Sequence, residues 1–199
     1  MIVRYLTHPQ VMIDPMMPVE RWGLNETGRR RVEAITAAAA LRGTTSVISS
    51  NETKAIETAQ PIAAALGFEL VIRHGMHEND RTATGYLPPE EFELVADQFF
   101  ANADQSVRGW ERAVDAQARI VAETLATFEN APEGDVLLVG HGAVGTLLMC
   151  HVAGWPIDRR HDQPGGGGNV FAFERQTLKL HHGWQPMETL KDPHEASPQ

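Results

Sequence analysis

Apolar positions along the chain form short continuous runs that alternate with longer periodic segments. The short runs are rich in β-branched and aromatic residues, as is typical of buried strands. They cover residues 1–7, 45–49, 68–72, 135–140, 169–173 and 177–182. The periodic segments predict helices at residues 25–43, 51–66, 88–100 and 110–128, with a further helix directly after residue 141. Strands that alternate with helices predict a three-layer α/β/α sandwich around a mostly parallel central sheet.

The length and composition predict a single domain. The chain has 199 residues, of which 42% are hydrophobic, and no shift in composition divides it. We expect one domain over residues 1–187 and a loose polar tail over residues 188–199. Four glycines at residues 165–168 lack the strand-to-helix setting of a nucleotide-binding loop. They predict a flexible approach to the closing strands.

The net charge limits the classes of partner that the chain can be expected to bind. A net charge of -9, with one short basic run at residues 29–31, argues against nucleic acid or an anionic membrane surface. The chain starts without the pattern of a signal peptide, and no apolar run reaches the roughly 18 residues that span a bilayer. The single cysteine, Cys150, cannot form an internal disulfide and is expected to be a buried small hydrophobe. We therefore expect a cytoplasmic protein.

Three groups able to bind or transfer an anion stand where predicted elements meet. His8 follows the first strand directly and is followed by Pro9, which ends the strand. His141 lies between a buried strand and a helix, where backbone N–H groups face an anion. Lys54 lies in the first turn of a helix, where a cation is disfavoured, so it either points to solvent or shares this position with a bound anion. Ligands of open α/β sheets bind at this strand-end edge.

Residues 73–81 are dense in titratable groups. His74, His77, Glu78 and Asp80 could bind a metal ion, but no second cluster with ligand spacing accompanies them. A solvated loop explains the composition equally well, and we predict no metal and no other cofactor.

The loop at residues 10–22 is too apolar for an ordinary solvent loop. It contains three methionines and two prolines, and methionine fills irregular gaps in many settings. The loop is therefore either packed on the core or a cover over a ligand.

Together, the strand-end residues suit phosphoryl transfer. A neutral imidazole such as that of His8 can attack phosphorus, while a cation and N–H groups hold the phosphoryl oxygens. A protonated carboxyl group such as Glu78 can donate its proton to the departing oxygen.

The chain resembles the histidine phosphatase superfamily, which has a phosphoglycerate-mutase-like fold, at four landmarks in the expected order. The Leu-Thr-His-Pro segment at 6–9 is similar to the family's strand-end Arg-His-Gly signature. Residues 23–28 resemble its proline-leucine-Ser/Thr-x-x-Gly helix start. The other two are the Ser-Ser-x-x-x-Lys-Ala-x-x-Thr-Ala segment at 49–59 and the second histidine at 139–142. The resemblance implies His8 as the nucleophile that forms a phosphohistidine, Lys54 and His141 as phosphate ligands, and Glu78 as general acid and later base.

The chain departs from the family signature at three positions. Thr7 stands at the phosphate-binding position where the family has arginine, Pro9 replaces glycine, and Lys54 replaces a second arginine. Lysine keeps the charge but loses the bidentate fork, and threonine loses both. Arg81 is our candidate for the missing phosphate-binding cation; the alternative is a surface ion pair with a neighbour such as Asp80.

One segment matches the family signature literally but in the wrong place. Arg73-His74-Gly75 follows the Ser-Ser helix instead of preceding it. We therefore assign the nucleophile to His8 and no role to His74.

The leading hypothesis is a metal-independent phosphomonoesterase that acts through phospho-His8 on a small phosphorylated metabolite. The alternative is a catalytically weakened or inactive protein of the same fold that binds a phosphorylated ligand. A phosphoglycerate mutase proper fits poorly, because residues 79–105 offer only Arg81 as a cation for a second acidic group, with Arg108 just beyond.

Overall fold

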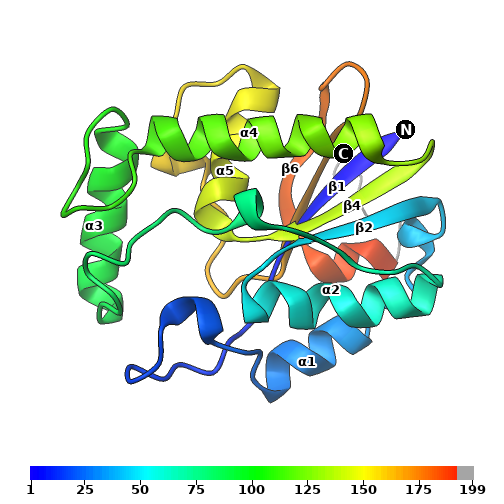
Figure 1. Cartoon of the computed structure of the whole chain (residues 1–199), viewed down its shortest axis with the longest axis horizontal. Helices are drawn as coiled ribbons and strands as arrows, with labels where there is room; N and C mark the ends of the chain where they lie inside the picture. The colour runs from blue at the N-terminus through cyan, green and yellow to red at the C-terminus, as the bar shows by residue number, and fades with distance from the viewer. Residues whose placement is uncertain (192–199) are drawn as a thin grey trace, which may run out of the picture.

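A six-stranded sheet forms the centre of the computed structural model, which describes residues 1–191 (Figure 1). The strands are β1 (Ile2–Thr7), β2 (Thr44–Ser50), β3 (Val71–Arg73), β4 (Asp135–Gly140), β5 (Asn169–Glu174) and β6 (Leu180–Pro186). They lie in the order β3-β2-β4-β1-β5-β6. The strands from β3 to β1 are parallel, whereas β5 and β6 are each antiparallel to their neighbours. The predicted, mostly parallel sheet is confirmed.

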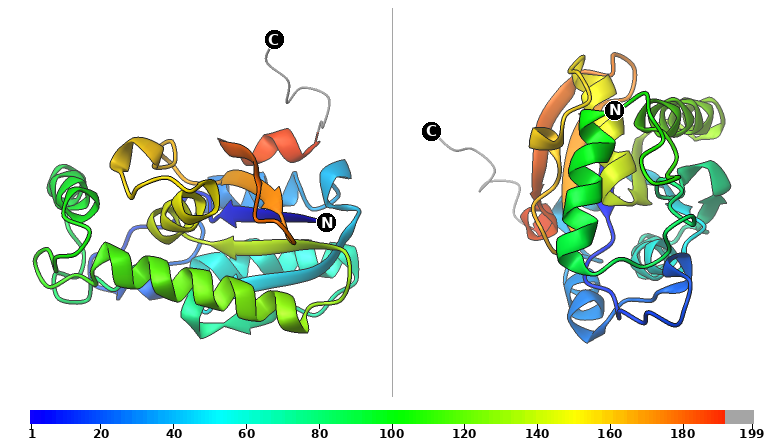
Figure 2. Two further views of the ribbon diagram at one scale, coloured as in Figure 1. Left: turned by 90° about the horizontal axis from the view of Figure 1, so that it is seen from above. Right: turned by 90° about the vertical axis from the view of Figure 1, so that its left-hand side faces the viewer.

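Helices cover both faces of the sheet. They are α1 (Glu26–Glu33), α2 (Thr53–Leu66), α3 (Pro89–Ala101), α4 (Ala113–Asn130) and α5 (Gly142–Ala153). Short 3-10 helices are η1 (Val19–Arg21), η2 (Ala39–Leu41), η3 (His74–Met76), η4 (Arg159–His161) and η5 (Met187–Lys191). Helices α1 and α2 lie on one face and α4 and α5 on the other, as Figures 1 and 2 show. The predicted three-layer α/β/α sandwich is therefore confirmed.

Two hydrophobic clusters hold the layers together, one on each face. Side chains of a strand point alternately to its two faces. Accordingly, Val136 and Leu138 pack in the cluster under α4 and α5, whereas Leu137 and Val139 pack in the cluster under α1 and α2. All four side chains are fully buried, which explains why β4 is a continuous apolar run in the sequence.

The first helix is shorter than its periodicity predicts. Asn25 caps α1 by accepting from the Gly28 N–H at 2.9 Å, as expected, but the helix ends at Glu33 instead of near residue 43. Beyond Glu33 the backbone forms hydrogen bonds between an N–H and the carbonyl three residues earlier, and these turns lead into η2. This turn lets Ile35 and Leu41 both be fully buried, and tertiary packing of this kind outweighs helix propensity.

The end of the described chain packs against the domain. Leu190 in η5 is buried, and Glu188 pairs with Arg31 at 2.7 Å. The loose tail predicted from residue 188 is thus not found at residues 188–191, and its remainder, residues 192–199, lies outside the described residues. Within residues 1–191, no helix is long and apolar enough to cross a membrane.

Candidate active site

The two histidines at strand ends lie side by side. His8 follows β1 and His141 follows β4, and these strands are parallel neighbours in the sheet. Their ring centroids are 5.4 Å apart, with an angle of 65° between the planes. The His8 N–H donates to the Gly140 carbonyl at 3.0 Å, which fixes the two strand ends relative to each other. Residues separated by more than 130 positions therefore form one site.

His8 is in the neutral form, which a nucleophilic imidazole needs. Its Nδ1 lies 2.9 Å from the Pro9 carbonyl oxygen, so Nδ1–H donates there and Nε2 keeps its lone pair. Burial, together with the positive charge of Lys54, lowers the pKa of His8 to about 4. Proline at position 9 removes an N–H but keeps the carbonyl that orients this ring.

Glycines 167 and 168 allow the chain to pass directly against His8. Both have positive φ angles, +66° and +65°. A Cβ at Gly167 would lie 2.4 Å from the His8 carbonyl oxygen, and the Gly168 N–H donates to that same oxygen at 2.9 Å. We expected only a flexible approach to the closing strands here. The structure instead gives these glycines a specific steric role beside the candidate nucleophile.

His141 is fully buried and held from two sides. Tyr5 bonds to its backbone, accepting from the His141 N–H at 3.1 Å and donating to the His141 carbonyl at 3.2 Å. Its Nε2 lies 2.7 Å from Ser50 Oγ and 3.4 Å from Glu52 Oε1. Burial lowers the pKa of His141 well below its ordinary value. In the described part of the chain its Nδ1 is buried without a hydrogen-bond partner, so this atom is available to a ligand.

Glu78 approaches the same edge from the loop after η3. Its Oε1 accepts from the Val144 N–H at 3.1 Å, in the first turn of α5, and from the Asn79 N–H at 3.1 Å. Burial raises the pKa of Glu78 even though the Arg81 charge opposes the shift. A carboxyl group that holds its proton at higher pH than usual suits a general acid.

Arg119 of α4 positions the Glu78 loop, and sequence reasoning did not identify it. Its Nη1 donates to the carbonyl oxygens of Gly75 and His77 at 2.8 and 2.9 Å, and its guanidinium pairs with Glu111. No local signal in the sequence points to this role, because Arg119 lies more than 40 residues from Glu78, in a helix predicted only from its apolar stripe.

Lys54 is buried and already has partners. Only 3% of its side chain is exposed, and its Nζ donates to Glu52 Oε2 and to the Val19 carbonyl at 2.8 Å. The alternative that Lys54 points to solvent is therefore excluded. The anion at this position is the Glu52 carboxylate of the chain itself.

Glu52 is the second site residue that sequence reasoning missed. Its Oε1 accepts from the Glu78 N–H at 2.8 Å and lies 3.4 Å from His141 Nε2. Burial alone would raise its pKa, but the neighbouring His141 and Lys54 hold the pKa of Glu52 well below its ordinary value. The one signal in the sequence is an acidic residue inside the Ser-Ser segment, two positions before Lys54.

The Thr7 hydroxyl is engaged in hydrogen bonds within the domain. Thr7 is fully buried, and its Oγ1 accepts from the Asn169 N–H at 2.9 Å and donates to Gln163 Oε1 at 2.7 Å. The hydroxyl thus ties the end of β1 to the start of β5. A contact between Thr7 and phosphate stays a prediction.

Arg81 lies at the cavity and not in a surface ion pair. Its guanidinium lies 4.9 Å from the Phe92 ring centroid and 6.0 Å from that of Trp110. Asp80 accepts instead from the backbone and hydroxyl of Thr82, and Arg81 forms no ion pair with any residue in the range 1–191. Its charge nevertheless lowers the pKa of His8 and of Glu78, so it is close enough to act on the site.

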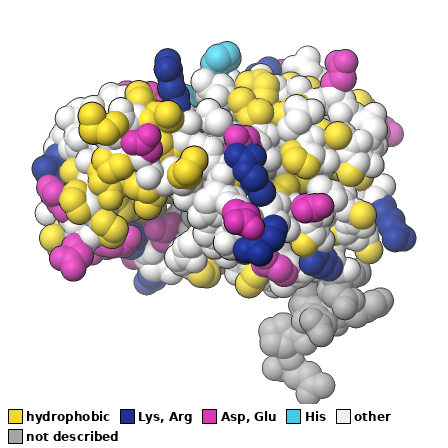
Figure 3. Space-filling view, turned by 90° about the horizontal axis from the view of Figure 1, so that it is seen from below, with side chains coloured by type: hydrophobic (Ala, Val, Ile, Leu, Met, Phe, Trp, Pro, Cys, Tyr) yellow, Lys and Arg dark blue, Asp and Glu magenta, His cyan; other side chains and the backbone are white. Residues whose placement is uncertain are grey.

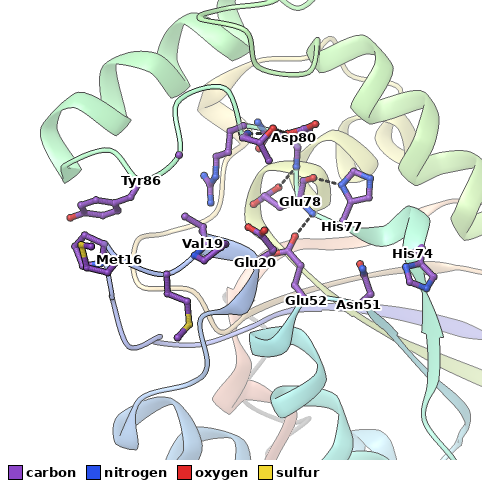
Figure 4. A pocket seen from close by; sticks show the side chains of 17 residues that line it. Met16, Val19, Glu20, Asn51, Glu52, His74, His77, Glu78, Asp80 and Tyr86 are labelled. Atoms are coloured by element: carbon purple, nitrogen blue, oxygen red, sulfur yellow. Dashed lines mark hydrogen bonds between the residues drawn. The ribbon is translucent and has the colours of Figure 1, made fainter.

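The remaining titratable residues of this segment do not form a metal site. Among the described residues, no three histidine, cysteine, aspartate or glutamate side chains are grouped so as to hold a metal ion. His77 Nδ1 lies 2.6 Å from the Glu78 carbonyl, and His74 lines the rim of the cavity (Figure 4).

A cavity of about 730 Å³ opens in front of Glu52 and Glu78. Figure 4 shows these two side chains at its inner end, with Met16 and Tyr86 across from them. The 10–22 loop supplies one wall through residues 15–20, and Met16 is 92% exposed, so this part of the loop faces a cavity instead of the core.

The apolar wall continues onto the outer surface. Figure 3 shows hydrophobic side chains gathered at the end of the molecule that carries the 10–22 loop and α3. Met12, Ile13 and Leu94 are among the exposed hydrophobic side chains of these segments.

Comparisons with known proteins agree with this architecture. The sequence profile of the histidine phosphatase superfamily (branch 1) matches residues 19–182, a range that begins after His8. No curated protein matches the chain. A mycobacterial glucosyl-3-phosphoglycerate phosphatase in complex with VO3 superposes with a TM-score of 0.77 at 19% identity, covering 93% of this chain and 98% of its own.

A second phosphatase superposes with a slightly lower TM-score. The phosphoserine phosphatase of Entamoeba histolytica, in complex with 3-phosphoglyceric acid, gives a TM-score of 0.74 at 16% identity and covers 94% of this chain and 98% of its own. At such identities the likeness shows a shared fold. The profile, in contrast, spans most of the chain, and on that ground the chain belongs to branch 1 of the histidine phosphatase superfamily.

Proposed function

We propose that the chain is a phosphomonoesterase that works through a phosphohistidine on His8 and acts on a small phosphorylated metabolite. The observation that carries this proposal is the pairing of His8 with His141 at 5.4 Å, next to the half-buried carboxyl group of Glu78. Family membership and the phosphatases of the same fold support the reaction class.

The reaction proceeds in two displacements. His8 Nε2 attacks phosphorus and the bond to the ester oxygen breaks, while Glu78 gives its proton to that oxygen. A water molecule then attacks the phosphohistidine, Glu78 takes a proton from it, and phosphate leaves with His8 neutral again. The steps need no metal ion, because the lowered pKa of His8 and the raised pKa of Glu78 supply the nucleophile and the acid.

The phosphoryl oxygens need donors and positive charge. His141 offers a buried nitrogen that has no hydrogen-bond partner among residues 1–191, and Lys54 and Arg81 offer charge. We assign these three residues, together with Thr7 at the end of β1, to phosphate binding. The cavity in front of Glu78 is large enough for the leaving group of a small metabolite.

A second candidate function is binding of a phosphorylated ligand without turnover. The observation that favours it is the set of existing partners at two phosphate-binding positions. The Thr7 hydroxyl is engaged by Gln163 and Asn169, and Lys54 is paired with Glu52. Loss of one preorganised donor typically lowers kcat by about 10²–10³-fold.

Trapping of the phosphoenzyme by an alkaline, denaturing quench separates the two functions. The chain is mixed with a ³²P-labelled phosphate monoester in EDTA, quenched, and assayed for acid-labile, base-stable label on the protein. Label on His8 with release of phosphate supports the phosphatase. Saturable binding of phosphate with no label and no turnover supports the binding protein, and neither binding nor turnover contradicts both.

A further inference from the structure

Glu52 has the contacts that a bound anion would have at this site. Its two carboxylate oxygens accept from Lys54 Nζ and from the backbone N–H of Glu78 at 2.8 Å. The oxygen that accepts from Glu78, Oε1, also lies 3.4 Å from His141 Nε2. A cation, a backbone N–H and an imidazole are the groups that hold a phosphoryl oxygen in a phosphate site.

Glu52 also stands at the boundary between the cavity and the histidines. Glu52 and Glu78 line the cavity, whereas His8 and His141 do not, and Glu52 contacts His141 from the cavity side. Figure 4 shows the Glu52 side chain rising into the cavity toward Glu78. Only 7% of Glu52 is exposed, so its charge is weakly screened by solvent.

A carboxylate and a phosphate dianion cannot share these groups without strong repulsion. Like charges brought together in a desolvated site are disfavoured, and one of the two anions must withdraw. Since Glu52 remains ionised beside Lys54, it does not withdraw by taking up a proton at ordinary pH.

We propose that the Glu52 carboxylate occupies the anion-binding position of this site and competes there with the phosphoryl group of a ligand, so that Glu52 sets how tightly the site holds phosphate. The inference rests on the proposed function only in placing the phosphoryl group between Lys54 and His141. A ligand must turn the Glu52 side chain out into the cavity before Lys54 can contact its phosphoryl oxygens. A phosphate ester can use the binding energy of its leaving group in the cavity to displace Glu52. Free phosphate has only the attraction of its own charge for this displacement.

The test is the affinity for inorganic phosphate, measured by titration calorimetry in wild type and in Glu52→Gln. Glutamine has the same length, and its carbonyl oxygen can accept from Lys54 or from the Glu78 N–H, which bond different oxygens of Glu52, so the change removes the charge and one of these two hydrogen bonds. We expect Glu52→Gln to bind phosphate at least about tenfold more tightly than wild type. Glu20→Gln is the matched control, because Glu20 lines the same cavity farther out and has no ion pair within the described chain. Its gain should be less than a third of that of Glu52→Gln.

A double variant shows whether Lys54 is the group that Glu52 keeps from contacting phosphate. The gain from Glu52→Gln should disappear when Lys54→Gln is added, because the released cation is then missing. If Glu52→Gln does not fold, Glu52→Asp replaces it. The shorter side chain keeps the charge near Lys54 but draws it back from His141, and we expect a gain of about two- to fivefold.

The outcomes separate this inference from the proposed function. Unchanged or weaker phosphate binding in Glu52→Gln, or an equal gain in Glu20→Gln, overturns the competition even if His8 is phosphorylated during turnover. Tighter binding in Glu52→Gln without any phosphohistidine upholds the competition and refutes the phosphatase. Absence of phosphate binding in every variant overturns both.

Discussion

Replacing Glu78 by glutamine should separate substrates by their leaving groups. Glutamine fills the same volume, and its carbonyl oxygen can still accept from the N–H groups of Val144 and Asn79, which bond Glu78 at 3.1 Å. The substitution therefore removes the transferable proton and leaves the loop in place. For an alkyl phosphate, loss of a general acid typically costs about 10²–10⁴-fold in rate, or about 2.7–5.4 kcal/mol of transition-state stabilisation.

An aryl phosphate provides the contrast. Its leaving group departs as a stable anion and needs little protonation, so we expect kcat/KM to fall by less than about tenfold. The assay compares kcat/KM for one alkyl and one aryl ester in wild type and Glu78→Gln, with phosphate release as the common readout.

Asp80→Asn is the matched control. Asp80 is exposed, and hydrogen bonds from the Thr82 backbone and hydroxyl lower its pKa, so it is ionised and unsuited to donate a proton. Equal losses on both esters in Glu78→Gln would refute the assignment. A dependence on the leaving group in Asp80→Asn instead would move the acid to that residue.

Four further predictions concern the histidines and Thr7. His8→Ala should abolish turnover and phosphohistidine trapping while His74→Ala stays within a few-fold; equal losses would show that His74 is the nucleophile. Because the pKa of His8 is lowered to about 4, kcat/KM for an aryl ester should fall only near pH 4, and an acid limb at its ordinary 6.5 would contradict this. The same shift should make the free energy of unfolding decrease as pH falls from 6.5 toward 4, because the unfolded chain binds a proton that folded His8 does not, and thermal melts across that range would measure it. Thr7→Arg should strengthen inhibition by phosphate but lower stability by about 1–3 kcal/mol through the lost hydrogen bonds to Asn169 and Gln163, and a folded variant with unchanged inhibition would show that position 7 faces away.

The parts of the site that sequence could predict are those fixed by strand ends. Parallel strands finish at one edge, so a histidine after β1 and another after β4 could be expected to meet, and they do. Helix α4 and strand β4 were likewise predictable because their patterns are long and unambiguous.

Side-chain partnerships at the site could not be predicted in this way. The Glu52–Lys54 pair depends on the rotamers of two side chains that lie two residues apart at the start of α2. The Arg119 contacts depend on how α4 packs against the loop after η3. The early end of α1 has the same origin, because the burial of Ile35 and Leu41 outweighs the helix propensity of the sequence after Glu33. Long-range packing decides each of these features, and a single sequence records it only indirectly.

The position of β1 in the middle of the sheet has a consequence for the order in which the protein is made. The strand that carries His8 is synthesised before both of its partners, because it pairs with β4 on one side and β5 on the other, with Leu6 opposite Val139 and Val170. Such distant pairings close slowly, and a chain on the ribosome cannot complete both of them until β5 has emerged. Until then His8 lies on an unpaired strand without the Gly140 and Gly168 contacts that fix its backbone. Truncated products of translation therefore carry the candidate nucleophile but not the geometry to use it.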